Sequence, residues 1–314
     1  MHSGIAAVFF SLAVSAFGQA VITDIGPDIR STSVKIAPGQ VVTVRVRGLK
    51  TKFGSGQVAT SVPLPTDFSG VSVTLRQNIN LRIVPLPLIR ADLSDACAWT
   101  VITPDPAVRV PCDDPDAGTL VFQVQMPYTL VSNGTAPLGS RPSAIADAVL
   151  SVQENGQAGR DLRVVPVLDQ VHILRRCSGP DRLFGEDQCT PDIYHADNSA
   201  VTPSNPARSG EILVGYAYGL GRPEVLIDAG ILTPLPGLRL ETPVSVQFPG
   251  LATNEDAAIY SGLVAGQVGL YQVNFRVPAL PSGLPACGPD RTSNLTMVVR
   301  GVVSSDTVGF CAEP

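Results

Sequence analysis

The chain contains 314 residues, of which 44% are hydrophobic and only 16% are charged, and its formal net charge is −5. This balance is too apolar for a disordered chain and too lightly charged for a protein of long exposed helices. The longest basic stretch is Arg175-Arg176, too short to neutralise a row of phosphates, so nucleic acid is not expected as a partner. The length exceeds what one hydrophobic core usually organises, which predicts two domains. Glycine (29) and proline (28) are spread along the whole chain, as in an all-β protein with many turns.

The N-terminal end has the pattern of a signal peptide. An apolar run covers residues 5–17, and the small residues Gly18 and Ala20 follow it, although no Lys or Arg precedes it. The run is too short for a bilayer-spanning helix and suits the apolar region of a signal peptide. We expect residues 1–20 to be removed; Val14 and Ala16 offer a second cleavage position, and an N-terminal β-strand is the alternative. No later segment is apolar for long enough to cross a membrane as a helix, so the sequence predicts a secreted, extracellular or cell-surface protein.

Alternation of apolar and polar residues is the main structural signal in the mature chain. It covers residues 42–47, 71–76, 120–126, 271–277 and 295–299. Each segment predicts an antiparallel strand with one face toward the core and one toward water. Turn pairs such as Pro38-Gly39 and Asn155-Gly156 separate the segments, a pattern typical of β-sandwiches.

Three sequence blocks recur in the same order in the two halves of the chain. Residues 37–49 resemble 209–220, residues 122–127 resemble 271–278, and residues 148–156 resemble 295–301. Such self-similarity predicts two copies of one immunoglobulin-like β-sandwich. We expect these copies at residues 21–174 and 207–314, with a compact, Pro- and Asp-rich connection at residues 175–206.

All six cysteines lie in the predicted mature chain. In an exported protein an even number indicates disulfide bonds, and although many pairings are open, sequential pairing closes the shortest loops. It predicts the bonds Cys97–Cys112, Cys177–Cys189 and Cys287–Cys311, each restricting the unfolded chain by about 3 kcal/mol. Zinc is the alternative, but the sequence has no C-x-x-C and no histidines at finger spacing.

Residues 205–214 (NPARSGEILV) and 218–221 (YGLG), preceded by His195 and residues 196–203, resemble a known family. This family is the uncharacterised C-terminal domain of exported acidobacterial proteins, with an immunoglobulin-like fold of the TIG/IPT kind. Residues 268–278 and 301–305 extend the similarity over residues 195–312, and residues 65–73 and 124–128 resemble the module more loosely. The added cysteines and the insert at residues 78–118 depart from the family pattern. The resemblance implies a bacterial, exported fold and no activity, cofactor or catalytic residue.

Candidate catalytic groups are few. Nucleophilic hydrolysis needs a serine or cysteine with a histidine base, but there is no G-x-S-x-G motif and only His172 and His195 could be the base. His172 lies in an alternating segment and His195 at a turn, so structural roles are expected for both. Acidic residues such as Glu211 follow turns and have no spacing that predicts a facing pair. The sequence therefore predicts a protein that is not an enzyme and needs no cofactor.

Two further features are candidate binding sites. Asp113, Asp114 and Asp116 follow Cys112 and could supply part of a calcium site, with an acidic turn as the alternative. Trp99 either packs against the Cys97–Cys112 bond or forms an exposed platform for a sugar, and packing is favoured.

These observations favour a non-catalytic extracellular or cell-surface binding module for a glycan or a protein, with residues 78–118 as the first candidate binding loop. A structural spacer of the cell envelope is the alternative, and an enzyme acting on polysaccharide or peptide is a distant one.

Overall fold

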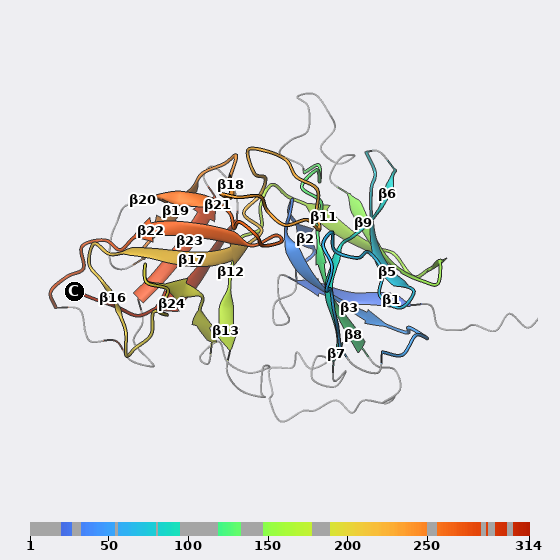
Figure 1. Ribbon diagram of the computed structural model, residues 1–314, viewed down its shortest axis with the longest axis horizontal. Helices are drawn as coiled ribbons and strands as arrows, with labels where there is room; N and C mark the ends of the chain where they lie inside the picture. Colours follow the sequence, from blue (N-terminus) through green and yellow to red (C-terminus); the bar gives the residue numbers. More distant parts are fainter. Residues whose placement is uncertain are drawn as a thin grey trace, which may run out of the picture.

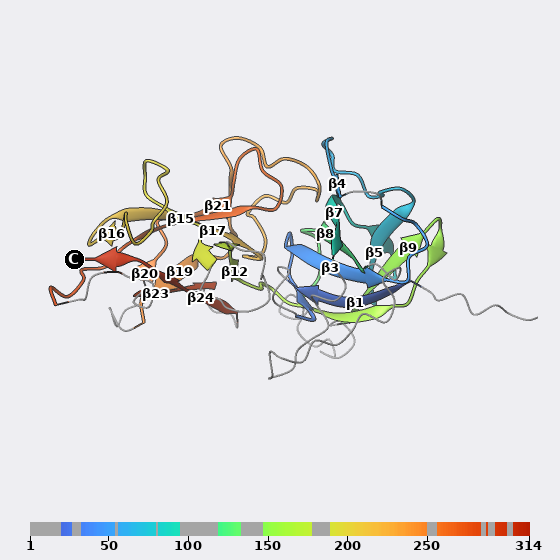
Figure 2. The ribbon, with the colours of Figure 1, turned by 90° about the horizontal axis from the view of Figure 1, so that it is seen from below.

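The computed structural model describes residues 20–26, 33–53, 56–79, 81–94, 119–132, 147–177, 189–249, 256–283, 287, 293–299 and 304–314. In Figures 1 and 2 the strands of the N-terminal half, residues 21–166, lie beside those of the C-terminal half, residues 172–313. The predicted all-β fold is confirmed: these ranges contain strands, turns and no helix. Within them, accordingly, no helix has the length and hydropathy of a membrane span.

Two sheets face each other in the N-terminal half. The strands of the first are ordered β1 (Val21–Gly26), β3 (Val41–Arg47), β8 (Thr119–Gln125), β7 (Leu88–Ser94) and β4 (Gln57–Val58). Those of the second are ordered β2 (Lys35–Ile36), β11 (Leu162–Pro166), β9 (Ala148–Glu154), β5 (Val71–Gln77) and β6 (Ile83–Pro85), with β10 (Gln157–Ala158) on β9. Their inward residues, among them Val44, Leu75 and Phe122, form one hydrophobic core.

The central strand β3 differs from its prediction. Alternation predicted that Thr43 and Arg45 face water, but they are only 1% and 3% exposed. The charge of the buried Arg45 is balanced by the neighbouring strand β1, whose Asp24 accepts a hydrogen bond from the Arg45 guanidinium at 2.5 Å. An ion pair of this kind lets a strand carry charged residues on a face that is covered.

The C-terminal half also has two principal sheets. The first is ordered β12 (His172–Ile173), β17 (Ile212–Tyr218), β22 (Tyr271–Arg276), β21 (Tyr260–Leu263) and β18 (Leu238–Arg239), and β15 (Ile193–Tyr194) also pairs with β17. The second is ordered β20 (Asp256–Ala257), β19 (Val244–Gln247), β23 (Ser293–Val299) and β24 (Ser305–Phe310). Two short pairs complete the half: β13 (Arg175–Cys177) with β14 (Cys189–Pro191), and β16 (Ala207–Arg208) with β25 (Ala312–Glu313).

The segment expected to connect two domains takes part in this second β-structure. Strand β15 hydrogen-bonds to β17, and Ile193 and Val201 are buried in the C-terminal hydrophobic core. Burial of these two apolar side chains also anchors the loop between them. The predicted boundaries at residues 174 and 207, and the count of two domains, stay predictions.

Buried polar groups join the two halves. The side-chain amide of Gln125 donates to the Tyr128 hydroxyl at 3.1 Å and accepts from the Gly230 backbone N–H at 2.7 Å. The hydroxyl of Tyr271, fully buried, donates to the Gly221 carbonyl at 2.6 Å within the C-terminal half and lies 3.4 Å from the Pro38 carbonyl oxygen of the N-terminal half. The Leu64 N–H donates to the Gly230 carbonyl at 2.7 Å. Because the Gln125 amide and the Tyr271 hydroxyl are shielded from water, their contacts strengthen the junction between the halves.

Candidate functional site

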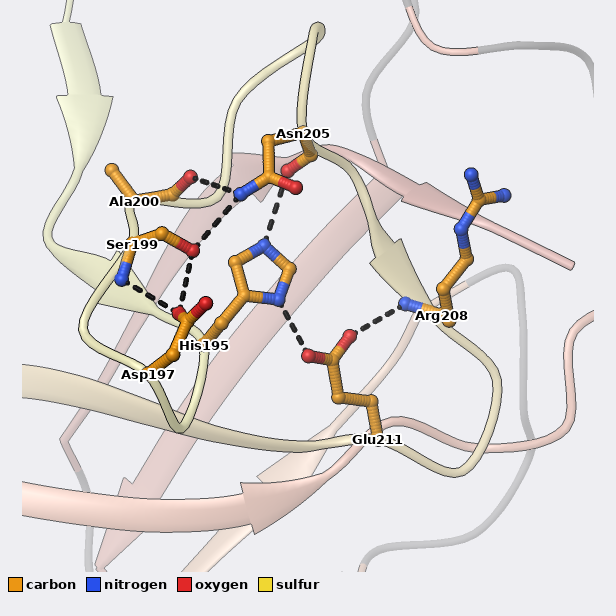
Figure 3. Close-up of polar contacts among 7 residues, drawn as sticks. All are labelled: His195, Asp197, Ser199, Ala200, Asn205, Arg208 and Glu211. Atoms are coloured by element: carbon orange, nitrogen blue, oxygen red, sulfur yellow. Dashed lines mark hydrogen bonds and ion pairs between the residues drawn. The ribbon is translucent and has the colours of Figure 1, made fainter.

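His195 is held on the loop between β15 and β16 by contacts to both ring nitrogens (Figure 3). Its Nδ1 lies 2.5 Å from Glu211 Oε1, and its Nε2 lies 3.2 Å from the Asn205 carbonyl oxygen. The second carboxylate oxygen of Glu211 accepts from the Arg208 N–H at 2.9 Å, so one carboxylate ties the loop to the start of β17. Asp197 closes the turn by accepting hydrogen bonds from the N–H and hydroxyl of Ser199.

Both partners of His195 are acceptors, which favours the doubly protonated imidazolium. Burial by itself would lower the pKa of His195. The hydrogen bonds to Glu211 and Asn205 and the negative charges of Glu211 and Asp197 outweigh it and raise that pKa above its usual value. A positively charged ring with both nitrogens bonded is a poor general base. Ser199, the nearest hydroxyl drawn in Figure 3, bonds to Asp197 and Asn205 rather than to the ring.

His172 is also structural. It is 6% exposed on β12, and its Nδ1 lies 3.7 Å from Asp306 Oδ2. The same carboxylate accepts from the Ile173 N–H at 2.8 Å and from the Arg175 guanidinium at 2.9 Å. Asp306 thereby fastens β24 to β12, and the two histidines expected to be structural hold strands and turns.

One of the three predicted disulfide bonds is confirmed. Cys287 and Cys311 form a disulfide bond, and Cys311 is buried in the C-terminal core. Cys177 and Cys189 are paired residues in the register of the β13–β14 ladder. The predicted Cys177–Cys189 bond stays a prediction.

Several candidate residues lie outside the described residues: Cys97, Cys112, Trp99, and the calcium candidates Asp113, Asp114 and Asp116. Of the candidate binding insert, residues 81–94 form β6, β7 and the turn between them, while residues 95–118 are outside the described residues. In the described part of the chain, no three His, Cys, Asp or Glu side chains are grouped so that they could hold a metal ion.

A site that the sequence reasoning missed lies on the outward face of the β15–β17–β22–β21–β18 sheet. Figure 2 shows this sheet above β19, β20, β23 and β24, so its outward face points away from the second sheet. The strand register places Tyr194, Val214, Asn274 and Tyr260 in one row across the sheet. The next row contains Tyr216, Gln272, Gly262 and Arg239. We call these two rows the tyrosine face.

Contacts between neighbours organise the tyrosine face. The rings of Tyr194 and Tyr216 meet edge to face with centroids 5.7 Å apart, and the Arg176 guanidinium lies 5.3 Å from the Tyr194 centroid. At the other side, the Arg239 guanidinium lies 5.2 Å from the Tyr260 centroid. Between these two clusters, the side-chain amide of Gln272 donates to Asn274 at 2.7 Å.

The Tyr260 ring lies over Gly262, two residues further along β21, which has no side chain. A Cβ atom at Gly262 would stand 2.5 Å from the Tyr260 hydroxyl oxygen, so any larger residue there would displace the ring. Tyr194, Tyr216, Tyr260, Gln272 and Asn274 are half-buried, whereas Arg239 is exposed. Fixed aromatic rings beside amides and a guanidinium, all reachable from solvent, are the groups from which binding sites for polar ligands are built.

One sequence signal could have indicated this face. In β17 the inward residues are Leu213, Gly215 and Ala217, while the outward residues include Val214 and Tyr216. Gly215 and Ala217 are thus small residues toward the core on either side of the large, outward Tyr216. A Cβ atom at Gly215 would lie 2.7 Å from the Met297 methyl group, the end of a flexible side chain that would have to shift. This reversal of residue size along the strand is the signal that the sequence contains.

Comparison with known proteins assigns no family. No family model matches the chain, and a search of curated proteins finds no match. Among solved structures, latent PorU from Porphyromonas gingivalis is similar at 13% identity and a TM-score of 0.24, over 94% of this chain and 24% of that one. Domains 4–9 of the surface layer protein SbsC give 12% identity and a TM-score of 0.21, over 94% of this chain and 32% of that one. The C-terminal domain of the Streptococcus agalactiae polypeptide BspA gives 9% identity and a TM-score of 0.17, over 93% and 99%. The chain thus spans about a quarter of the PorU chain it matches.

Proposed function

We propose that this protein is an exported, non-catalytic binding module that acts at the cell surface and contacts its ligand through the tyrosine face. The observation that carries the proposal is the cross-strand arrangement of Tyr194, Tyr216 and Tyr260 around the amides of Gln272 and Asn274. Rigid side chains with few rotatable bonds lose little entropy when they bind, which is why tyrosine is frequent in recognition surfaces.

A disulfide bond and the N-terminal sequence support export. The Cys287–Cys311 disulfide is typical of proteins that fold outside the reducing cytosol, and residues 1–20 have the pattern of a signal peptide. The resemblance of residues 195–312 to a family of exported acidobacterial domains, which is itself part of the proposal, also supports export.

The absence of catalysis is supported by the state of the two histidines. His195 is bonded at both nitrogens, and His172 is buried beside Asp306. Neither is presented to a nucleophile among the described residues, which leaves a binding role as the better account of the exposed face.

A structural spacer of the cell envelope is the second candidate, and the junction between the halves favours it. The buried amide of Gln125 bonds to Gly230 and the buried hydroxyl of Tyr271 contacts the Pro38 carbonyl oxygen, so both connect the halves away from water. A spacer needs such stiffness, but it does not need the tyrosine face, and the two functions can be separated by experiment.

The proposal is tested by retention of the purified, oxidised mature protein on insoluble glycans, peptidoglycan and cell-envelope fractions. We expect saturable retention by one material that is lost in a Tyr216→Ala, Tyr260→Ala double variant. An Arg163→Gln variant is the control, because Arg163 is an exposed residue of the other half, paired with Asp147. If no material retained the protein, or if the double variant were retained as well as the wild type, the tyrosine face would be rejected as the binding surface.

A further inference from the structure

We propose that the ligand of the tyrosine face is an acidic polysaccharide, whose uronic acid carboxylates pair with Arg239 and Arg276. This inference rests on the proposed function and adds the chemical class of the ligand.

Charge complementarity is the first argument. Arg176, Arg239 and Arg276 lie on or beside this face, and Arg176 is paired with Asp192 at 2.7 Å. The exposed Arg239 and Arg276 place two further positive charges on this face of a chain whose formal net charge is −5. Since a polyanion is repelled by the molecule as a whole, its binding would have to come from such a local concentration of cations.

The second argument is the presentation of the guanidinium groups. Arg239 is exposed, and its contact within the described residues is the Tyr260 ring, 5.2 Å from the ring centroid. The negative π-face of the ring stabilises the cation, and the exposed guanidinium keeps N–H groups with which a ligand can bond. Arg276, two residues along β22 from Asn274, is also exposed and donates one bond, to the Gly210 carbonyl at 2.6 Å. Each therefore has N–H groups left for the bidentate bond that carboxylates accept.

The third argument concerns the sugar rings themselves. Their C–H groups carry a partial positive charge that is attracted to the negative faces of aromatic rings such as Tyr194 and Tyr216. Their hydroxyl groups match the donor and acceptor atoms of Gln272 and Asn274. Tyr194 and Tyr260 are three strands apart in one row, which places their backbones about 14 Å from each other at the usual strand spacing. A surface of that length accommodates a chain of linked sugars rather than a monosaccharide.

The experiment is affinity electrophoresis of the oxidised mature protein in native gels that contain polygalacturonate, alginate or the methyl ester of polygalacturonate. The ester keeps the backbone of its parent polymer and lacks its negative charge. We expect retardation by at least one uronate polymer and about tenfold weaker retardation by the ester, the ratio that loss of about 1.4 kcal/mol produces. The Arg239→Gln, Arg276→Gln double variant is expected to lose the difference between the two, while Arg163→Gln keeps it.

Matched tyrosine variants test the platform under Arg239. Tyr260→Phe keeps the ring and should keep the retardation, whereas Tyr260→Ala should lower it about as far as Arg239→Gln does. Far-UV circular dichroism and melting curves establish that each variant is folded. Equal losses in Tyr260→Phe and Tyr260→Ala would contradict the role given to the ring.

The outcomes separate this inference from the proposed function. Equal retardation by the acid and its methyl ester would overturn the acidic class of ligand. No retardation by either uronate polymer, together with Tyr216-dependent retention on an envelope fraction, would overturn the inference and leave the proposed function intact. No retention in either experiment would reject both.

Discussion

Replacing Gly219 by alanine tests the packing of the junction between the halves. Gly219 follows β17 with a φ of +73°, and its carbonyl accepts from the Gln170 N–H at 2.8 Å. A Cβ atom at this position would stand 2.1 Å from the Gln170 carbonyl oxygen, which is a backbone atom that cannot rotate away. Gly266 provides a matched control: its φ is +71°, and a Cβ there would meet nothing within 4 Å.

The difference between the two variants isolates the clash. Left-handed backbone costs a non-glycine residue roughly 1–2 kcal/mol, and both alanine variants share that cost. Overpacking adds about 1–3 kcal/mol for Gly219→Ala alone. We therefore expect Gly219→Ala to lower the free energy of unfolding by about 3 kcal/mol and Gly266→Ala by about 1 kcal/mol.

Urea unfolding followed by far-UV circular dichroism measures the two values. With a urea dependence of about 2 kcal/mol per molar, the expected gap is a separation of midpoints by about 1 M. If the two variants unfolded at the same midpoint, the close approach of Gly219 to Gln170 and the packing of the junction built on it would be refuted.

Three further variants test other parts of the account. His195→Gln should lower the melting temperature most between about pH 5 and pH 6.5 and less at higher pH. Because the pKa of His195 is raised in the folded protein, its protonation stabilises the fold fully below the unfolded-state pKa of about 6.5. This stabilisation is lost as the pH rises through the folded-state pKa. Removing the Cys287–Cys311 bond with serines should cost about 3 kcal/mol in urea unfolding, because the bond closes a loop of 24 residues. Gln125→Leu should cost about 2 kcal/mol by the same assay, since it leaves the buried Gly230 N–H without its acceptor.

Each of these predictions has an outcome that would contradict it. A His195→Gln effect that stays constant from pH 5 to pH 8 would show that the imidazolium contributes no stability through its charge. A serine double variant as stable as the wild type would show that the Cys287–Cys311 loop is already restricted in the unfolded chain. For Gln125, the control is Gln57→Leu, which removes an exposed hydrogen bond to Ser69 and should change the free energy of unfolding by less than about 0.5 kcal/mol. If the two variants had equal effects, the buried bond of Gln125 to Gly230 would contribute nothing to stability.

Local pattern was enough to predict the strands and one disulfide. The alternation in residues 71–76, 271–277 and 295–299 corresponds to β5, β22 and β23, because one covered face per strand leaves a period of two in the sequence. Cys287 and Cys311 were paired by their spacing alone. The prediction was wrong for β3, where Arg45 is buried and paired with Asp24, a residue that becomes its neighbour only through long-range strand pairing.

The tyrosine face could not be predicted in the same way, because its residues come from five strands whose register is set by the fold. Tyr194 belongs to a segment that was expected to be a connection, and it reaches the face only because β15 pairs with β17. Tyr216 and Tyr260 lie on strands β17 and β21, which come to opposite sides of β22. Their roles emerge from pairing between strands, which composition and period do not specify.

The most direct test of the central claim is nitration of tyrosines by tetranitromethane, read residue by residue by mass spectrometry, in the free protein and in protein retained on its envelope material. Tyr194, Tyr216 and Tyr260 are predicted to react in the free protein and to be protected when bound. Tyr128 and Tyr271, at most 1% exposed, are internal controls that stay unreactive in both states. If the three tyrosines of the face reacted equally in the free and the retained protein, the ligand would bind elsewhere and the account would be wrong.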